Sequence, residues 1–197
     1  MYGNSVRPSS FSFSKHELLE LLKAWVGVTI VFSIFLSSAL DIQTSVIVSV
    51  ISVGLGVIVH ELAHKLVAQH YGCFAEFRSF PVFLLLSIGL AFLGVVAIAP
   101  GAVFISGPLG VRRNGVISAV GPFSNLLLAL IFLGISFIPL QSELLHAIIV
   151  YGFKINGWLA LFNLIPFGPL DGKKIFNWNK IIYGAMVVLS FVLVFAL

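Results

Sequence analysis

Four long apolar segments constrain the fold of this chain more than any other feature. They cover residues 24–40, 44–69, 116–139 and 145–166. A helix needs about 17 to 25 apolar residues to cross the hydrocarbon core of a bilayer, and each segment reaches that range. A fifth segment, 181–197, is just long enough. The pattern predicts an all-α, polytopic membrane protein, a bundle of about five spanning helices.

The low charge content points the same way. Only 9% of the 197 residues are charged, whereas a soluble domain carries about a quarter. The net charge of +4 is typical of a membrane protein whose cytoplasmic loops collect Lys and Arg. The basic residues lie between apolar segments, so we expect no nucleic-acid partner. The single cysteine, Cys73, excludes an internal disulfide and a cysteine-based metal site.

The chain reads as one membrane domain with a short N-terminal extension. We expect a tail and an interfacial helix at 1–23 and a single membrane-embedded domain at 24–197. Ser14 and Glu17 have the spacing of a capping box, which predicts a helix start at this point. The N-terminus has no short apolar region followed by a cleavage site, so we expect no signal peptide.

The distribution of charge predicts the orientation. Basic residues precede the first, third and last apolar segments and follow the second, at Arg7, Lys15, Lys23, Lys65, Arg78, Arg112, Arg113, Lys173, Lys174 and Lys180. The positive-inside rule places these ends, and with them the N-terminus, on the cytoplasmic side of a cell membrane. Lys65, near the end of an apolar segment, is expected to extend its ammonium group towards the lipid headgroups.

This orientation requires residues 81–111 to leave and return on the same side. The stretch contains Pro100 and several glycines and is too long for one crossing, so we expect a re-entrant or short β element. Within it, "GAVFIS" at 101–106 is rich in β-branched and aromatic residues and is flanked by Gly and Pro. It could form an edge strand, which can pair with an unwound segment of another protein by strand addition.

The second apolar segment contains the sequence "HELAH" at 60–64. On a helix, His60 and His64 lie on one face and can reach one metal ion, while Glu61 is turned off that face, close enough to act on a bound water. Imidazole nitrogen is a favoured zinc ligand, and zinc lowers the pKa of its water towards 7. Ionisable residues within a membrane are rare and usually functional.

A catalytic zinc needs a third protein ligand. Most of the seven acidic residues are expected near one surface or the other, which leaves Asp171 in "FNLIPFGPLDGKK". Pro166 and Pro169 end the preceding helix, and Gly172 allows a tight turn, so that the carboxylate can point inward from unwound backbone. His70 is a weaker candidate because it is rotated about 240° from His64 on a helix.

At these residues the sequence resembles the site-2 protease family of intramembrane zinc metalloproteases. Three motifs match in order, "HELAH" at 60–64, "GPFSN" at 121–125 and "NLIPFGPLDG" at 163–172. The resemblance covers about residues 44–172. Three features depart from common members. Lys-Lys follows the Leu-Asp-Gly motif, and residues 81–111 separate the first motif from the second by more than is expected of a minimal member. The chain also shows no PDZ-like or nucleotide-sensing domain. The usual regulatory inputs are therefore either missing or supplied by another chain.

The resemblance implies that His60, His64 and Asp171 bind one Zn²⁺ per chain and that Glu61 is the catalytic base. It implies cleavage of a transmembrane-helix protein substrate within the lipid bilayer, near the cytoplasmic side. Asn125 and Asn163 occupy motif positions suited to holding the substrate backbone or the developing oxyanion. Interhelical hydrogen bonds are an equal alternative for both residues.

Two other classes of function stay open. One is a zinc-binding membrane protein without proteolysis, such as a sensor, a carrier or an inactive homologue. The other is a membrane scaffold with incidental polar residues, which predicts no bound metal. The feature that favours a protease is Glu61, because a sensor or carrier has no need of a base that does not bind the metal.

Overall fold

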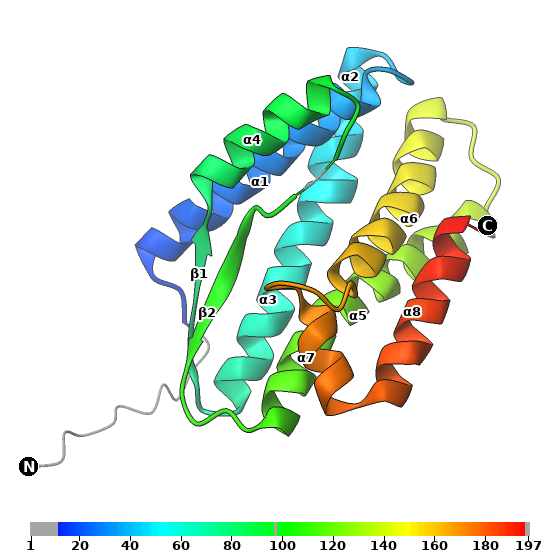
Figure 1. Cartoon of the computed structure of the whole chain (residues 1–197). Helices are drawn as coiled ribbons and strands as arrows, with labels where there is room; N and C mark the ends of the chain where they lie inside the picture. Colours follow the sequence, from blue (N-terminus) through cyan, green and yellow to red (C-terminus); the bar gives the residue numbers. More distant parts are fainter. Residues whose placement is uncertain (1–11, 97, 196–197) are drawn as a thin grey trace, which may run out of the picture.

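The computed structural model describes residues 12–96 and 98–195. Eight α-helices, one π-helical segment and two short strands follow one another in this part of the chain (Figure 1). Their order is α1 (Lys15–Leu36), α2 (Ile42–Val48), η1 (Ser49–Gly54), α3 (Leu55–His70), β1 (Phe74–Ser79), α4 (Pro81–Phe92), β2 (Gly101–Ser106), α5 (Val111–Ser136), α6 (Glu143–Asn163), α7 (Asp171–Trp178) and α8 (Lys180–Phe195).

Four helices are long and apolar enough to cross a membrane. They are Lys15–Leu36, Ile42–His70, Val111–Ser136 and Glu143–Asn163, among the described residues. Each corresponds to one of the four long segments expected from the sequence, which confirms an all-α polytopic membrane protein. The fifth expected span is a shorter apolar helix of 16 residues, α8.

The second span, Ile42–His70, is one continuous helix made of α2, η1 and α3. Its π-helical segment, Ser49–Gly54, shifts which residues lie on each face of the helix just before the histidines. Such π-bulges are frequent at functional sites. The indole N–H of Trp25 on α1 donates to the carbonyl of Val50 at 3.3 Å. A Cβ at Gly54 would collide with the Trp25 ring, so glycine is needed where α1 meets the bulge.

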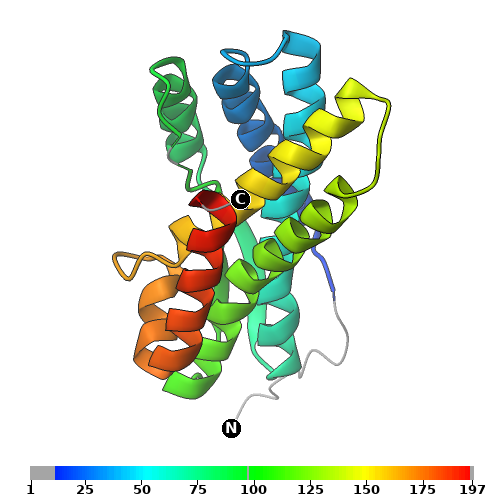
Figure 2. The ribbon, with the colours of Figure 1, turned by 90° about the vertical axis from the view of Figure 1, so that its right-hand side faces the viewer.

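The segment between α3 and α5 contains two strands and a helix, so part of residues 81–111 is a short β element, as predicted. β1 and β2 pair antiparallel with Phe74 opposite Ser106 and Ser79 opposite Gly101, and the predicted strand at 101–106 is β2 itself. α4 connects them as a short helix at the edge of the bundle beside α1 (Figure 2). Gly27 of α1 makes room for Leu84 of α4 at this contact. Residues 81–111 thus combine a helix and a strand.

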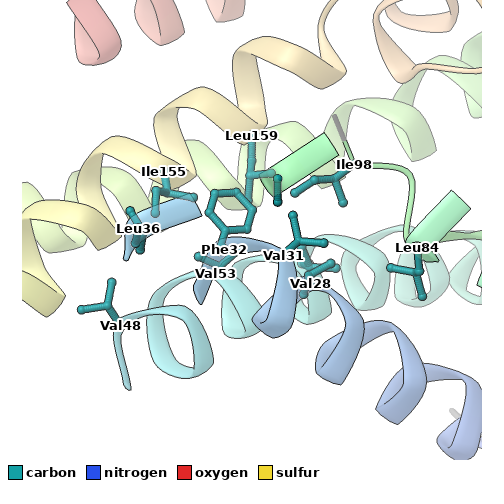
Figure 3. Close-up of a cluster of buried hydrophobic side chains, with 12 residues drawn as sticks. Val28, Val31, Phe32, Leu36, Val48, Val53, Leu84, Ile98, Ile155 and Leu159 are labelled. Atoms are coloured by element: carbon teal, nitrogen blue, oxygen red, sulfur yellow. The ribbon is translucent and has the colours of Figure 1, made fainter. Parts of the chain in front are cut away.

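The largest buried apolar cluster lies between α1, the second span, α4 and α6 (Figure 3). It contains Val28, Val31, Phe32, Leu36, Val48, Val53, Val57, Leu84, Ala91, Ile98, Ile155 and Leu159. A second cluster packs α5 and α6 against α7 and α8. The two clusters fix α3, α5 and α7 relative to one another, and these are the helices that carry the polar residues described next.

The helix start predicted at Ser14 is confirmed, whereas the surroundings of Lys65 differ from the expectation. Ser14 caps the helix by accepting from the Glu17 N–H at 3.0 Å, as predicted, and α1 then continues without a break past residue 23. Lys65 does not extend towards the headgroups, because its ammonium group is buried in an ion pair with Glu17. That partner was not foreseen because the two residues are 48 positions apart.

Candidate metal centre

The HELAH motif lies on α3, within a helix long enough to span the membrane. His60, Glu61 and His64 are all buried, at 6–8% exposure. The two imidazoles meet edge to face with their centroids 4.7 Å apart, as expected for positions separated by one helical turn. α3 therefore presents both rings to the same place.

One face of α5 supports these rings. Ile117, Gly121 and Asn125 are spaced by four residues, so they lie in a row along that face. The Ile117 carbonyl accepts from His64 Nδ1 at 2.6 Å, and Asn125 Oδ1 lies 2.6 Å from His60 Nδ1. Gly121, between them, is where a Cβ would collide with Nε2 of both histidines. The GPFSN motif thus combines room for the rings with a hydrogen bond to one of them.

Asp171 reaches the same point from the loop that follows α6. Gly168 in this loop has φ of +61°, a conformation that favours glycine, and Asp171 is the first residue of α7. A Cβ at Gly172 would collide with the carbonyl of Leu164, so glycine allows α7 to start against the end of α6. The Leu-Asp-Gly motif therefore places a buried carboxylate at a tight helix junction.

The structure brings His60, His64 and Asp171 together, with their ligand atoms within 4.8 Å of one another. Asp171 Oδ2 lies 3.1 Å from Nε2 of His64 and 3.4 Å from Nε2 of His60, and the two Nε2 atoms are 3.0 Å apart. On a zinc tetrahedron with bonds of about 2.0 Å, ligand atoms are about 3.3 Å apart. The three atoms thus have the mutual spacing of zinc ligands.

The proton positions also favour a cation at this point. A carbonyl can only accept, so His64 Nδ1 must carry its proton towards Ile117 O. The Asn125 amide N–H groups donate to Gly56 O at 3.1 Å and to Asn156 Oδ1 at 3.0 Å, so its oxygen faces His60 Nδ1, which must also be protonated. In neutral imidazoles both Nε2 lone pairs then converge with the carboxylate, an arrangement that a metal ion satisfies.

Asn156 belongs to the site and was missed from the sequence. It is fully buried on α6, and its N–H groups donate to Ser52 O at 3.1 Å and Gly152 O at 2.8 Å. These two bonds fix its amide orientation, and it in turn fixes that of Asn125. An amide inside the apolar segment 145–166 was the available signal, since such groups seek interhelical partners.

The two asparagines expected to contact substrate have different surroundings. Both N–H groups of Asn125 donate within the protein and its oxygen faces His60, and the residue also lines the cavity beside the metal site. Asn163 donates one bond to Leu159 O at 2.9 Å and lines the cavity beside the metal site. A role towards substrate stays a prediction for both residues.

A cavity of about 160 Å³ opens beside the three ligands. Its lining comes from α3, β2, α5, α6 and the start of α7, and includes Glu61, Ser118, Asn163, Lys174 and residues 101–103. Val103 of β2 and Glu61 of α3 thus line the same cavity. Lys174 lies with Nζ 3.6 Å from Asp171 Oδ1, the carboxylate oxygen that is turned away from the histidines. A base, a cation site and a strand edge therefore share one cavity.

Together, the fold and the site define a helical membrane protein with a buried two-histidine, one-carboxylate metal-binding cluster. A protein of Methanocaldococcus jannaschii, named "Putative zinc metalloprotease MJ0611", is 39% identical over 177 residues, which are 89% of this chain and 91% of that protein. The chain therefore belongs to the zinc metalloprotease family that this relative represents. No family model matches the chain, and no solved structure matches it.

Proposed function

We propose that the protein is an intramembrane zinc metalloprotease of the site-2 type, which cleaves a transmembrane-helix substrate within the bilayer. The observation that carries the proposal is the position of Glu61. It lies beside the two histidines and Asp171 in the same cavity, yet is not part of their cluster. A buried carboxylate next to a metal-binding cluster is suited to proton transfer.

His60, His64 and Asp171 would hold one zinc ion per chain. Bound there, zinc would supply Lewis acidity, which polarises a peptide carbonyl and makes water more acidic. Glu61 would take the proton from the attacking water and deliver it to the leaving amide nitrogen. Asn125 and Ile117 hold the two imidazoles in the tautomer that metal binding requires.

The free edge of β2 would hold the substrate. Phe77 and Ser79 of β1 donate their N–H groups to side chains of α1, so their partners Val103 and Gly101 form non-hydrogen-bonded pairs. The backbone groups of Val103 and Gly101 therefore point away from β1, towards the cavity. A substrate segment that unwinds from its helix could pair with this edge by strand addition, which supports cleavage beside Glu61.

Reconstitution in lipid vesicles tests the proposal. Wild type and Glu61→Gln would each be incubated with a pool of single-span membrane helices, and new peptide ends would be mapped by mass spectrometry. The zinc content of both proteins would be measured on the same samples. We expect cuts within apolar spans with wild type and none above background with Glu61→Gln at equal zinc.

Two results would contradict the proposal in different ways. Cuts that persist in Glu61→Gln would exclude Glu61 as the base. Bound zinc without cuts by either protein, across a pool that includes helices containing Gly, Pro and Asn, would favour a zinc sensor or carrier. A zinc-flux measurement on the same vesicles would then distinguish those two.

A further inference from the structure

Two buried glutamates at the start of α1 have no part in the chemistry described above. Glu17 is 1% exposed and Glu20 is 7% exposed, although acidic residues are almost never buried without a partner. They lie three residues apart on one face of α1, the face that meets β1. Their partners show what this burial achieves.

Both carboxylates bind the outer edge of β1. Glu17 Oε1 accepts from the backbone N–H of Phe77 at 3.0 Å, and Glu20 Oε2 accepts from that of Ser79 at 3.1 Å. The Ser79 hydroxyl also donates to Glu20. Alternate N–H groups of a strand point to the same edge, so the two glutamates occupy the places that a neighbouring strand would use. The outer edge of β1 is closed in this way.

The same carboxylates tie the sheet to the helix that carries the histidines. The second oxygen of Glu17 pairs with Lys65, which is 1% exposed and directly follows His64 on α3. Phe77 and Val103 pack with residues of α1 and α3 in a small apolar cluster that also contains Leu21. The sheet therefore has a fixed position relative to α3, through polar contacts on one side and apolar contacts on the other.

We propose that Glu17 and Glu20 act as a carboxylate clamp, which closes the edge of β1 and positions the free edge of β2 against Glu61. Because the edge of β1 is closed, a substrate strand can pair only with the edge of β2 within the described sheet. The position of that edge determines which substrate peptide bond lies beside Glu61. The glutamates are positioning residues, since they act through the sheet and do not touch the cavity. This inference rests on the proposed protease function and names how its substrate is held.

Glu20 is the better position for a test. Removing Glu17 takes away the carboxylate that pairs with the buried Lys65 ammonium group, whereas the salt-bridge partner of Glu20 is Lys23, whose side chain is 58% exposed. Glu20→Ala removes the acceptor for Ser79. Glu20→Gln keeps an acceptor oxygen without the charge. Lys23→Ala is the matched control, because it removes the exposed partner and leaves the clamp in place.

The experiment measures kcat, KM and the cut position on membrane peptides that wild type cleaves in a Glu61-dependent manner, together with zinc content. We expect Glu20→Ala to bind zinc as wild type does, to lose at least tenfold in kcat/KM, and to produce additional cuts at neighbouring bonds. A misplaced scissile bond has this effect even when the catalytic groups are intact. Glu20→Gln should recover most of the activity and the single cut, and Lys23→Ala should stay within twofold of wild type.

Other outcomes would overturn the inference. An unchanged cut position and kcat/KM in Glu20→Ala would show that the clamp does not position the substrate. A loss of activity that parallels a loss of zinc would assign Glu20 to general stability. If wild type and Glu61→Gln behave alike on every peptide, the proposed function itself fails, and this result is distinct because it does not depend on the clamp variants.

Discussion

His60 Nδ1 lies 2.6 Å from Oδ1 of Asn125, and both groups are buried between α3 and α5. The amide of Asn125 is itself oriented by Gly56 and Asn156. A chain of hydrogen bonds from α6 through α5 thus determines which nitrogen of His60 is free. Hydrogen-bonded partners of this kind set the basicity and the orientation of metal-binding imidazoles.

We therefore expect Asn125→Ala to weaken zinc binding by about 10- to 100-fold. Competition with a fluorescent zinc chelator measures this affinity in detergent. Asn163→Ala is the control, because its amide bonds to Leu159 and not to a histidine, and its zinc affinity should equal that of wild type. Equal affinities of the two variants would contradict the role of Asn125.

Gly121 offers a test of the space beside the histidines. A Cβ at this position would collide with Nε2 of His60 and His64, whereas one at Gly134 on the same helix meets nothing within 4 Å. We expect Gly121→Ala to abolish zinc binding at micromolar zinc. Gly134→Ala should bind zinc normally, and its helix should gain up to about 1 kcal/mol from the higher propensity of alanine. Normal zinc binding by Gly121→Ala would contradict the close approach of α5.

The Glu17–Lys65 ion pair predicts a strongly non-additive pair of substitutions. Glu17→Leu alone should destabilise the protein by about 3 to 5 kcal/mol, because it removes the carboxylate that pairs with the buried Lys65 ammonium group. Glu17→Leu combined with Lys65→Met should recover more than half of that loss. Denaturant unfolding in mixed micelles measures the difference. A double variant no more stable than the single one would show that Lys65 finds another partner.

Convergence of two imidazole lone pairs with a carboxylate predicts that zinc stabilises the folded state. A ligand that binds only the folded state adds about 2.7 kcal/mol at a concentration of 100 Kd. We expect the unfolding temperature of wild type to rise with zinc concentration and that of Asp171→Asn to stay nearly constant. The same rise in both proteins would place the zinc at another site.

Much of this architecture could be predicted from the sequence. The four long spans follow from hydrophobic length alone, and residues 101–106 form a strand as their β-branched composition indicated. The approach of Asp171 to the histidines was also expected, because so few acidic residues can lie inside the membrane. In each case one strong physical constraint, either burial in lipid or the number of metal ligands, was sufficient.

What the sequence did not reveal depends on contacts between distant segments. The pairing of Lys65 with Glu17 needs the packing of α1 against α3, and no local pattern indicates it. The relay through Asn156 depends on the way α6 approaches the second span, where Asn156 donates to the carbonyl of Ser52 in the π-helical segment Ser49–Gly54. Closure of the β1 edge by two glutamates likewise needs the register of a sheet against a helix, which propensities do not determine.

Zinc analysis of five proteins tests the division between ligands and base most directly. Wild type, Glu61→Gln, His60→Ala, His64→Ala and Asp171→Ala would be purified at equal free zinc, and metal per chain would be measured by mass spectrometry. We predict about one zinc per chain in wild type and Glu61→Gln, and far less in the three ligand variants. Zinc retained by Asp171→Ala, or lost from Glu61→Gln, would contradict the assignment of a two-histidine, one-aspartate centre with Glu61 as its base.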